Sequence, residues 1–272
     1  MPVPEQDKPL PVSSSVPPEF PEEQKQLFRD VLELVNEKAV PYAVAGTFAL
    51  HEHTGIWRAT KDLDLFMEPQ QVPAAMELLA QAGFETYVKD PVWIAKACRG
   101  QHFVDLITGM SNAVVKVDKS WIERGVATWV LGIPVRVLAA EELIVSKIFV
   151  TRRERFDGAD IAHLVYAKGR SLDWERILLL VDEHWELLLW ALVLFRYIYP
   201  AHTRAVPLHI WDKLLKRLRE EIINPDLNAN FRGSLIDENM FAIDVNEWGM
   251  RNVIEEYRAQ HPDRLPNQPD AA

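Results

Sequence analysis

Residues 44–50 (VAGTFAL) and 58–66 (RATKDLDLF) decide the fold of this 272-residue chain. The first segment is predicted to end a strand at a glycine-threonine turn and to begin a helix, with Thr47 as the expected helix cap. The second segment is predicted to be a strand. Alternate residues of a strand point to opposite faces, so Asp62 and Asp64 project to the same side while the leucines beside them enter the core.

The two aspartates of the second segment predict a cation site. Two unpaired carboxylates about 4 Å apart repel each other by roughly 4 kcal/mol at an effective dielectric constant of about 20. Such a pair either shares a proton, which raises one pKa, or holds a cation. Carboxylate oxygens are hard ligands of the kind that Mg²⁺ and Mn²⁺ prefer. The alternative is a solvated strand end, the commoner setting of an isolated Asp-x-Asp.

The composition is typical of a folded protein that does not coat nucleic acid. Hydrophobic residues make up 48% of the chain, and 30 basic residues against 40 acidic ones give a net charge of −10. This sign argues against an extended nucleic-acid-binding surface. The single cysteine, Cys98, excludes an internal disulfide and a thiolate zinc site and is compatible with a cytoplasmic location. The most apolar stretch, 187–195, is far shorter than the ~20 residues that cross a bilayer, so no membrane contact is expected.

Hydrophobic periodicity predicts an α+β fold. Strands are predicted at 42–45, 60–67, 84–88, 92–98, 102–108, 126–130 and 133–138, with helices at 22–40, 48–53 and 72–82. From residue 139 onward the pattern becomes helical, with helices predicted at 139–150, 157–167, 173–199, 208–222 and 245–258. Trp174, Trp185 and Trp190 are predicted to lie in the core of this helical part.

We therefore expect a mixed β-sheet core flanked by helices, followed by an all-α domain. The proline-rich residues 1–21 are predicted to be a disordered tail. The core is assigned to 22–138, the helical domain to 139–222, and a C-terminal extension to 223–272.

The polar residues of the core and of the first helices share a pattern with a known family. The pattern is a Gly-Thr turn, an Asp-x-Asp strand, a third aspartate in an apolar strand, and a helical segment that carries lysine, arginine and aspartate. The residues are Gly46, Thr47, Arg58, Thr60, Asp62, Asp64, Asp105, Lys147, Arg152, Arg153, Asp157 and Asp160. This pattern resembles the polymerase-beta-like nucleotidyltransferase superfamily, and most closely its small bacterial branch of abortive-infection type (AbiEii-like) nucleotidyltransferases.

The resemblance implies a metal-dependent enzyme whose nucleotidyltransferase core is residues 22–138. Such an enzyme transfers a nucleoside monophosphate from a Mg²⁺-bound nucleoside triphosphate, such as ATP, to a hydroxyl acceptor and releases pyrophosphate. The acceptor would be RNA such as tRNA, a protein or a small molecule. Asp62, Asp64 and Asp105 would hold two Mg²⁺ or Mn²⁺ ions about 3.5 to 4 Å apart. Asp105 would also accept the proton of the acceptor.

The resemblance also implies residues that bind the nucleotide. Backbone N–H groups at Gly46 and Thr47, with the positive end of the following helix, would bind the phosphates. Lys147 would neutralise charge on the triphosphate, and Asp157 and Asp160 would bind the base or the ribose. The arginines that would contact the acceptor or a phosphate are Arg58, Arg152 and Arg153.

Simpler structural roles stay open for several of these residues. Asp105 could be a strand-edge aspartate paired with a lysine, and Lys147 could extend from the core face to solvent. Asp157 and Asp160 could cap a helix or pair with Arg153. For the whole chain, one alternative is a catalytically inactive nucleotide-binding or protein-interaction module. Another is the toxin of a toxin–antitoxin pair, with an antitoxin protein as its partner.

Overall fold

The computed structural model describes residues 18–260 and residue 265. The predictions for residues 1–17 of the proline-rich tail, and for 261–264 and 266–272 of the C-terminal extension, lie outside the described residues. The described chain divides into two compact units. The sheet unit comprises residues 18–52, 56–139, 255–260 and 265, and the helical unit comprises residues 53–55 and 140–254.

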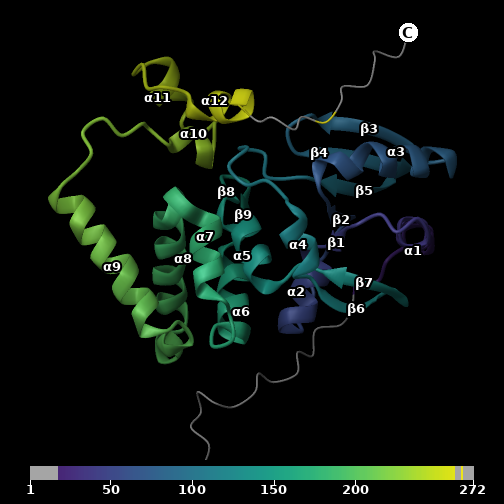
Figure 1. Cartoon of the computed structure of the whole chain (residues 1–272), viewed down its shortest axis with the longest axis horizontal. Coiled ribbons are helices and arrows are strands. Elements are labelled where there is room, and N and C mark those ends of the chain that lie inside the picture. Colours follow the sequence, from purple (N-terminus) through teal and green to yellow (C-terminus); the bar gives the residue numbers. More distant parts are fainter. Residues whose placement is uncertain (1–17, 261–264, 266–272) are drawn as a thin grey trace, which may run out of the picture. The chain divides into compact units, whose positions relative to one another are not determined.

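A seven-stranded mixed sheet forms the centre of the sheet unit (Figure 1). Its strands, in spatial order, are β3 (Glu85–Asp90), β4 (Ile94–Arg99), β5 (His102–Ile107), β2 (Asp62–Phe66), β1 (Ala43–Val44), β7 (Ile133–Val137) and β6 (Val126–Val130). The β2–β5 and β1–β7 pairs are parallel, and the other neighbours are antiparallel. The mixed sheet that the sequence predicted is confirmed.

Amphipathic helices cover this sheet. α1 (Glu22–Glu37) carries Leu27, Val31 and Val35 at helical spacing, and all three are buried. It packs against β5, β7 and α3 (Val72–Gln81). The shorter helices of this unit are α2 (Gly46–Thr54), η2 (Pro69–Gln71) and α4 (Lys119–Glu123).

One described residue of the predicted tail, Phe20, packs into the core. Phe20 lies in the stretch that was expected to be disordered, yet its side chain is only 8% exposed. Its ring contacts the rings of Phe28 and Phe48, with centroids 5.8 and 5.9 Å away. This aromatic cluster fixes the chain just ahead of α1, because burial of large apolar rings stabilises the fold.

The helical unit is built around α5. Its elements are α5 (Ala140–Ile148), β8 (Thr151–Arg152), β9 (Arg155–Phe156), α6 (Gly158–Lys168), α7 (Trp174–Val181), η3 (Asp182–His184), α8 (Trp185–Ile198), η4 (Pro200–Ala205), α9 (Leu208–Ile223), α10 (Gly233–Ile236) and α11 (Ala242–Asn246). Every residue of α5 is buried, and this helix packs against α6, α7 and α8. In the described residues, no helix has both the length and the apolar character needed to cross a membrane.

Two predictions within the helical part are wrong. The helix predicted over 173–199 breaks at Asp182, whose backbone φ is +42°, and so divides into α7, η3 and α8. Trp190 is 45% exposed, although Trp174 and Trp185 are buried as expected. Because α8 is apolar on most of its circumference, periodicity alone does not identify its buried face. The β8–β9 hairpin carried no strand signal in the sequence.

The C-terminal segment of the described chain, from residue 255, is part of the sheet unit. The last helix, predicted to begin at residue 245, is α12 (Val253–Gln260) and follows Gly249, whose backbone φ is +70°. Arg258 Nη2 donates to both carboxylate oxygens of Asp90 at 2.9 and 2.8 Å. Arg258 Nη1 donates to the carbonyl oxygen of Ser111 at 2.8 Å. These bonds attach α12 to the end of β3 and to the segment that follows β5.

Replacing Arg176 by alanine is expected to destabilise the helical unit. The Arg176 guanidinium lies 3.0 Å from the carboxylate of Glu142, whose side chain is completely buried. Loss of the cation leaves a buried charge without its ion-pair partner, so we expect a loss of about 3–5 kcal/mol in the free energy of unfolding in urea. The double variant Glu142→Leu/Arg176→Leu removes both charges and should recover most of that loss. Equal losses in the two variants would contradict this account.

Candidate functional site

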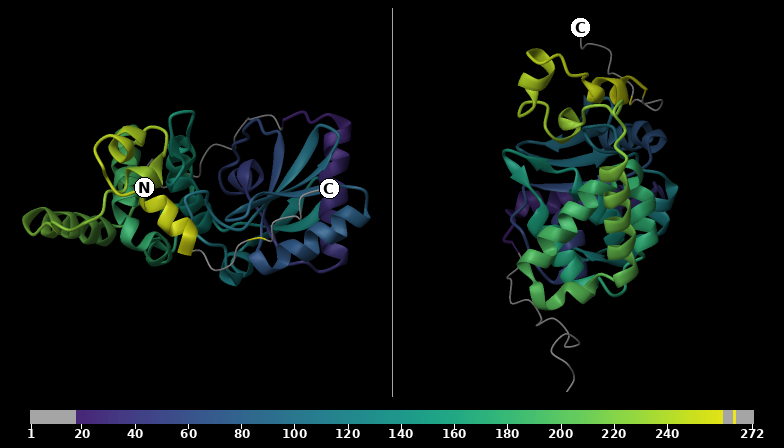
Figure 2. Two further views of the ribbon diagram at one scale, coloured as in Figure 1. Left: turned by 90° about the horizontal axis from the view of Figure 1, so that it is seen from above. Right: turned by 90° about the vertical axis from the view of Figure 1, so that its left-hand side faces the viewer.

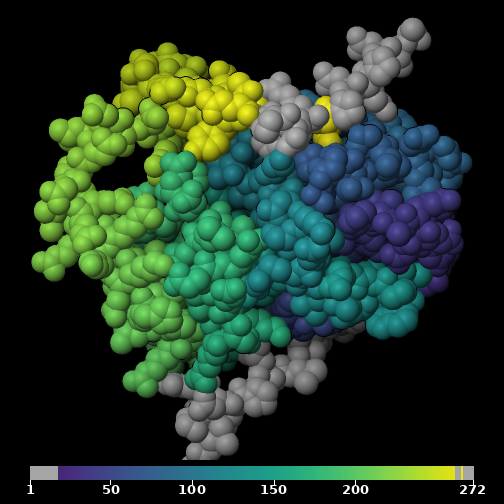
Figure 3. Space-filling model, viewed as in Figure 1, coloured from purple at the N-terminus to yellow at the C-terminus, as the bar shows by residue number. Residues whose placement is uncertain are grey.

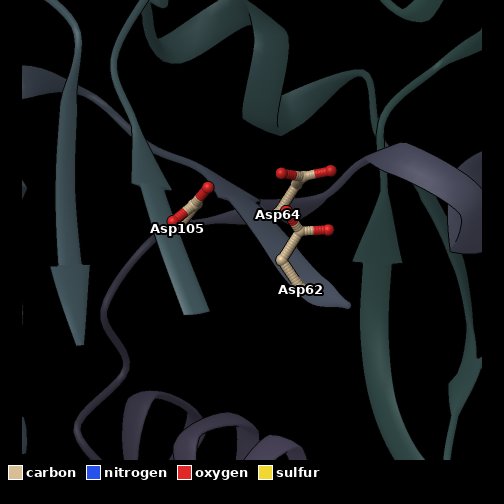
Figure 4. A group of neighbouring side chains, drawn as sticks. All are labelled: Asp62, Asp64 and Asp105. Atoms are coloured by element: carbon tan, nitrogen blue, oxygen red, sulfur yellow. The ribbon is translucent and has the colours of Figure 1, made fainter. Parts of the chain in front are cut away.

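Three aspartates converge on one face of the sheet (Figure 4). β2 and β5 are parallel neighbours, and their register pairs Asp64 with Asp105. Asp62 lies two residues before Asp64 and therefore projects from the same face of β2. The alternate residues Leu63 and Leu65 are fully buried on the opposite face. The fold thus brings together the three acids that were predicted to be metal ligands.

The geometry of these carboxylates suits a divalent cation. One oxygen from each of the three side chains lies within 4.8 Å of the others. Asp62 and Asp64 are half-buried, and Asp105 is 7% exposed. The hydroxyl of Thr60 donates to Asp62 Oδ1 at 2.7 Å and so orients that carboxylate. Three hard oxygen donors at these separations fit Mg²⁺ or Mn²⁺.

Gly46 allows the start of α2 to approach the cluster closely. Its backbone φ is +57°, and a Cβ atom placed on it would lie 2.2 Å from Oδ2 of Asp64. Thr47 is not the predicted helix cap, because α2 already begins at Gly46. Its hydroxyl instead donates to the carbonyl oxygen of Arg58 at 3.0 Å and accepts from the Arg58 N–H at 2.9 Å. Glycine and threonine therefore join the first turn of α2 to the segment that carries the acids.

A buried lysine that the sequence-based predictions did not include, Lys96, is the counter-ion of Asp105. Its Nζ donates a hydrogen bond to Asp105 Oδ1 and lies 3.7 Å from the centroid of the Phe103 ring. The side chains of Lys96 and Asp105 are 9% and 10% exposed. Burial raises the pKa of the Asp105 carboxyl above its usual value, and the hydrogen bond from Lys96 acts in the opposite direction. The alternative of a pairing with a lysine is confirmed for Asp105, but the strand-edge setting is wrong because β5 lies between β4 and β2.

The short turn between β4 and β5 could have identified Lys96 as the partner of Asp105. A two-residue turn, Gly100 and the glutamine after it, joins the strands, so Arg99 pairs with His102. Loops of this length fix the register of the strands that they connect. Three positions farther along each strand, Lys96 stands opposite Asp105.

A second buried ionic cluster lies in the helical unit. Lys147 donates to the carboxylates of Asp157 and Asp160, each at 2.8 Å, and the three side chains are 9%, 11% and 14% exposed. Lys147 therefore does not extend to solvent. Burial alone would raise the pKa of Asp157, but hydrogen bonds from Arg155 and Lys147 hold that pKa below its usual value. Asp157 precedes α6 without a capping hydrogen bond from its side chain, and Arg155, not the expected Arg153, bonds it.

The three arginines predicted to contact the acceptor or a phosphate are exposed. Arg58 precedes β2 in the sheet unit, whereas Arg152 and Arg153 belong to the β8–β9 hairpin and its turn in the helical unit. The backbone N–H of Arg153 donates to Asp237 Oδ2 at 3.2 Å, which attaches the hairpin to the residue after α10. Their contacts with a substrate stay predictions.

A family model and several solved structures are similar to this chain. The model described as "Nucleotidyl transferase of unknown function (DUF2204)" matches residues 24–186, more than half of the chain. No curated protein matches the chain in sequence.

The solved structures are similar at low identity. The antibiotic-resistance factor ANT(2'')-Ia is 17% identical over 67% of this chain and 97% of its own, with a TM-score of 0.44. The lincomycin-bound lincosamide antibiotic adenylyltransferase LnuA is 16% identical over 54% of this chain and 98% of its own, with a TM-score of 0.38. An antigenic nucleotidyltransferase-like protein from Paracoccidioides brasiliensis is 18% identical over 68% of this chain and 94% of its own, with a TM-score of 0.43.

Replacing Gly46 by alanine is expected to weaken Mn²⁺ binding, because the new methyl group displaces the Asp64 carboxylate from the cluster. The matched control is Gly100→Ala, which has a similar backbone φ of +63° but no atom within 4 Å of the new Cβ. Both variants should lose about 1–2 kcal/mol in the free energy of unfolding through backbone strain. Only Gly46→Ala should raise the Mn²⁺ dissociation constant, by ~10-fold or more in an electron paramagnetic resonance titration. Equal affinities in the two variants would refute the close approach of Gly46 to a metal ligand.

Proposed function

Because this chain belongs to the family of nucleotidyl transferases of unknown function (DUF2204), we propose that it transfers a nucleoside monophosphate from a metal-bound nucleoside triphosphate to a hydroxyl acceptor. The observation that carries this proposal is the convergence of Asp62, Asp64 and Asp105 beside the glycine at the start of α2. A metal–triphosphate site needs hard anionic ligands next to backbone donors for phosphate. In the sheet unit the three aspartates and the first backbone N–H groups of α2 lie side by side.

In the proposed reaction the acceptor oxygen attacks the α-phosphorus of the triphosphate. The bond from that phosphorus to the oxygen bridging to the β-phosphate breaks, and pyrophosphate leaves. The N–H groups of Gly46 and Thr47 bind the β- and γ-phosphates at the positive end of α2. The acceptor proton passes to Asp105, which has a second carboxylate oxygen besides the one that bonds Lys96. Mg²⁺ held by the three aspartates would supply Lewis-acid stabilisation of the charge on the phosphate.

Lys96 determines how much positive charge the cluster needs. Three carboxylates and one ammonium together carry two negative charges. One divalent cation neutralises them, whereas two would leave a net positive charge that a bound triphosphate offsets. We therefore propose that the protein binds one Mg²⁺ or Mn²⁺ in the absence of nucleotide and a second together with the triphosphate.

The finer assignments are proposals of the same kind. Candidate acceptors are a hydroxyl of RNA such as tRNA, of a protein or of a small molecule, and the net charge of −10 favours a compact acceptor over long RNA. ATP as the triphosphate, a cytoplasmic location and the abortive-infection branch with its antitoxin partner rest on the sequence alone. The residues proposed for the nucleotide and the acceptor outside the sheet cluster are Lys147, Asp157, Asp160, Arg58, Arg152 and Arg153.

One observation favours a second candidate, a nucleotide-binding module without turnover. The buried hydrogen bond from Lys96 occupies one oxygen of Asp105, the residue that would accept the proton. The hydrogen bond from Lys96 acts to lower the pKa of Asp105. If it leaves the second oxygen of Asp105 too weak a base, metal and triphosphate bind but the acceptor is not deprotonated. Binding and turnover therefore have to be measured separately.

The purified protein, incubated with Mg²⁺, labelled triphosphates and candidate acceptors, is expected to transfer label from the α-phosphate only. Asp64→Asn should lower this transfer ~100-fold or more, since a lost metal ligand removes several kcal/mol of transition-state stabilisation. Asp30→Asn, which removes a carboxylate on α1 in the same unit, should leave transfer unchanged. Transfer of γ-label would identify a kinase instead. Full activity of Asp64→Asn would remove the metal assignment, and triphosphate binding without transfer would favour the inactive module.

Replacing Lys96 by methionine is expected to lower stability without metal and to tighten Mn²⁺ binding. The variant leaves Asp105 buried without its counter-ion, and it also removes a cation that repels the metal. Mn²⁺ should therefore raise the melting temperature of Lys96→Met more than that of the wild-type protein, with a dissociation constant lower by ~10-fold or more. Lys96→Arg keeps the charge and should behave like the wild type. Loss of Mn²⁺ binding in Lys96→Met would contradict the counter-ion role.

A further inference from the structure

The apolar face of α9 is wider than the face that the described chain covers. Ile210 and Leu214 lie on the covered side and are buried, as is Trp211 next to them. Leu208, Leu215 and Ile222 form a second stripe at intervals of seven residues and are 73%, 49% and 68% exposed. Residues seven apart lie on one side of a helix, the spacing by which two helices pack along their length.

The second half of α9 makes little buried contact with the rest of the helical unit. All of its buried residues precede Leu215. Figure 2 shows α9, in light green, projecting beyond the other helices of the helical unit, and Figure 3 shows its side chains lying open at the surface. The ion pairs Lys216–Glu220 and Arg217–Glu221 within this half are exposed and contribute little. A 16-residue helix is marginal in water unless its apolar face is packed.

We propose that α9 packs antiparallel against α9 of a second copy of this chain, around a two-fold axis near Leu215. Leu208 and Ile222 stand seven positions before and after Leu215, so an antiparallel copy places each against the other. Asp212 stands three positions before and Arg219 four positions after, so the same axis places each beside its opposite charge in the partner. A stripe that complements itself in this way is the requirement for an isologous two-fold interface.

Charge favours a second copy over a different partner. Both Asp212 and Arg219 are exposed on the outer border of the stripe, and neither forms an ion pair within residues 18–260. Their mutual pairing would be formed twice across the axis, which selects the antiparallel orientation. α9 carries four basic and three acidic residues, so two copies of it meet nearly without repulsion even though the chain has a net charge of −10.

The full chain is therefore expected to be a dimer at micromolar concentration in sedimentation equilibrium. Leu215→Glu brings two carboxylates together at the axis and should raise the dimer dissociation constant ~100-fold or more. The matched control is Leu179→Glu on α7, an equally apolar position that is 69% exposed and lies outside the stripe. It should remain dimeric. The circular dichroism spectra and the Mn²⁺-induced change in melting temperature should be the same in both variants.

Charge reversal tests the orientation of the two helices. Asp212→Arg and Arg219→Asp should each weaken the dimer, because each places like charges side by side across the axis. The double variant restores opposite charges and should recover dimerisation to within about threefold of the wild type. A monomeric wild-type chain at 100 µM would overturn the proposal, and so would a dimer unaffected by Leu215→Glu. Single charge variants that are not rescued by the double variant would overturn the antiparallel arrangement.

Discussion

The parallel pairing of β2 with β5 is the constraint on which the candidate site depends. Its register sets Asp64 directly opposite Asp105, and the alternation of β2 adds Asp62 to the same face. Like charges placed opposite one another destabilise a sheet. β4 offsets part of this cost because its own register places the ammonium of Lys96 opposite Asp105. Three neighbouring strands thus hold a charge arrangement that none of them would form alone.

The four charged residues of this cluster differ in how well the sequence alone predicts their positions. Asp62 and Asp64 follow from the period of a single strand, which is local information. Asp105 required a family resemblance, because nothing in the chain states which distant strand pairs with β2 or in which register. Lys96 lay within reach of prediction, since the short turn after Arg99 fixes its partner. The sequence patterns therefore succeed for elements whose geometry is set within about ten residues and fail where strand order decides.

Local sequence patterns are also insufficient in the helical unit. Periodicity correctly predicts that the chain is helical there, but it does not say which side of an apolar helix is covered. Periodicity predicts that Trp190 lies in the core, yet it is 45% exposed, because α8 offers apolar residues in nearly every direction. α9 shows the converse, since its apolar residues lie on two adjoining stripes and its own unit covers only one. Which apolar stripe of a helix stays exposed depends on how the helices of the unit pack together. The sequence of one helix does not determine it.

The surroundings of two buried lysines, Lys96 and Lys147, differ in a way that bears on the metal site proposed in the sheet unit. In the helical unit Lys147 bonds Asp157 and Asp160, and Arg155 also bonds Asp157, so two cations face two anions. In the sheet unit the ammonium of Lys96 bonds Asp105, one of three carboxylates that lie close together. Partly buried charge in excess of its counter-ions costs free energy that the folded chain alone does not recover. A cation from solution would offset this cost, which supports the proposal that Asp62, Asp64 and Asp105 bind a metal ion.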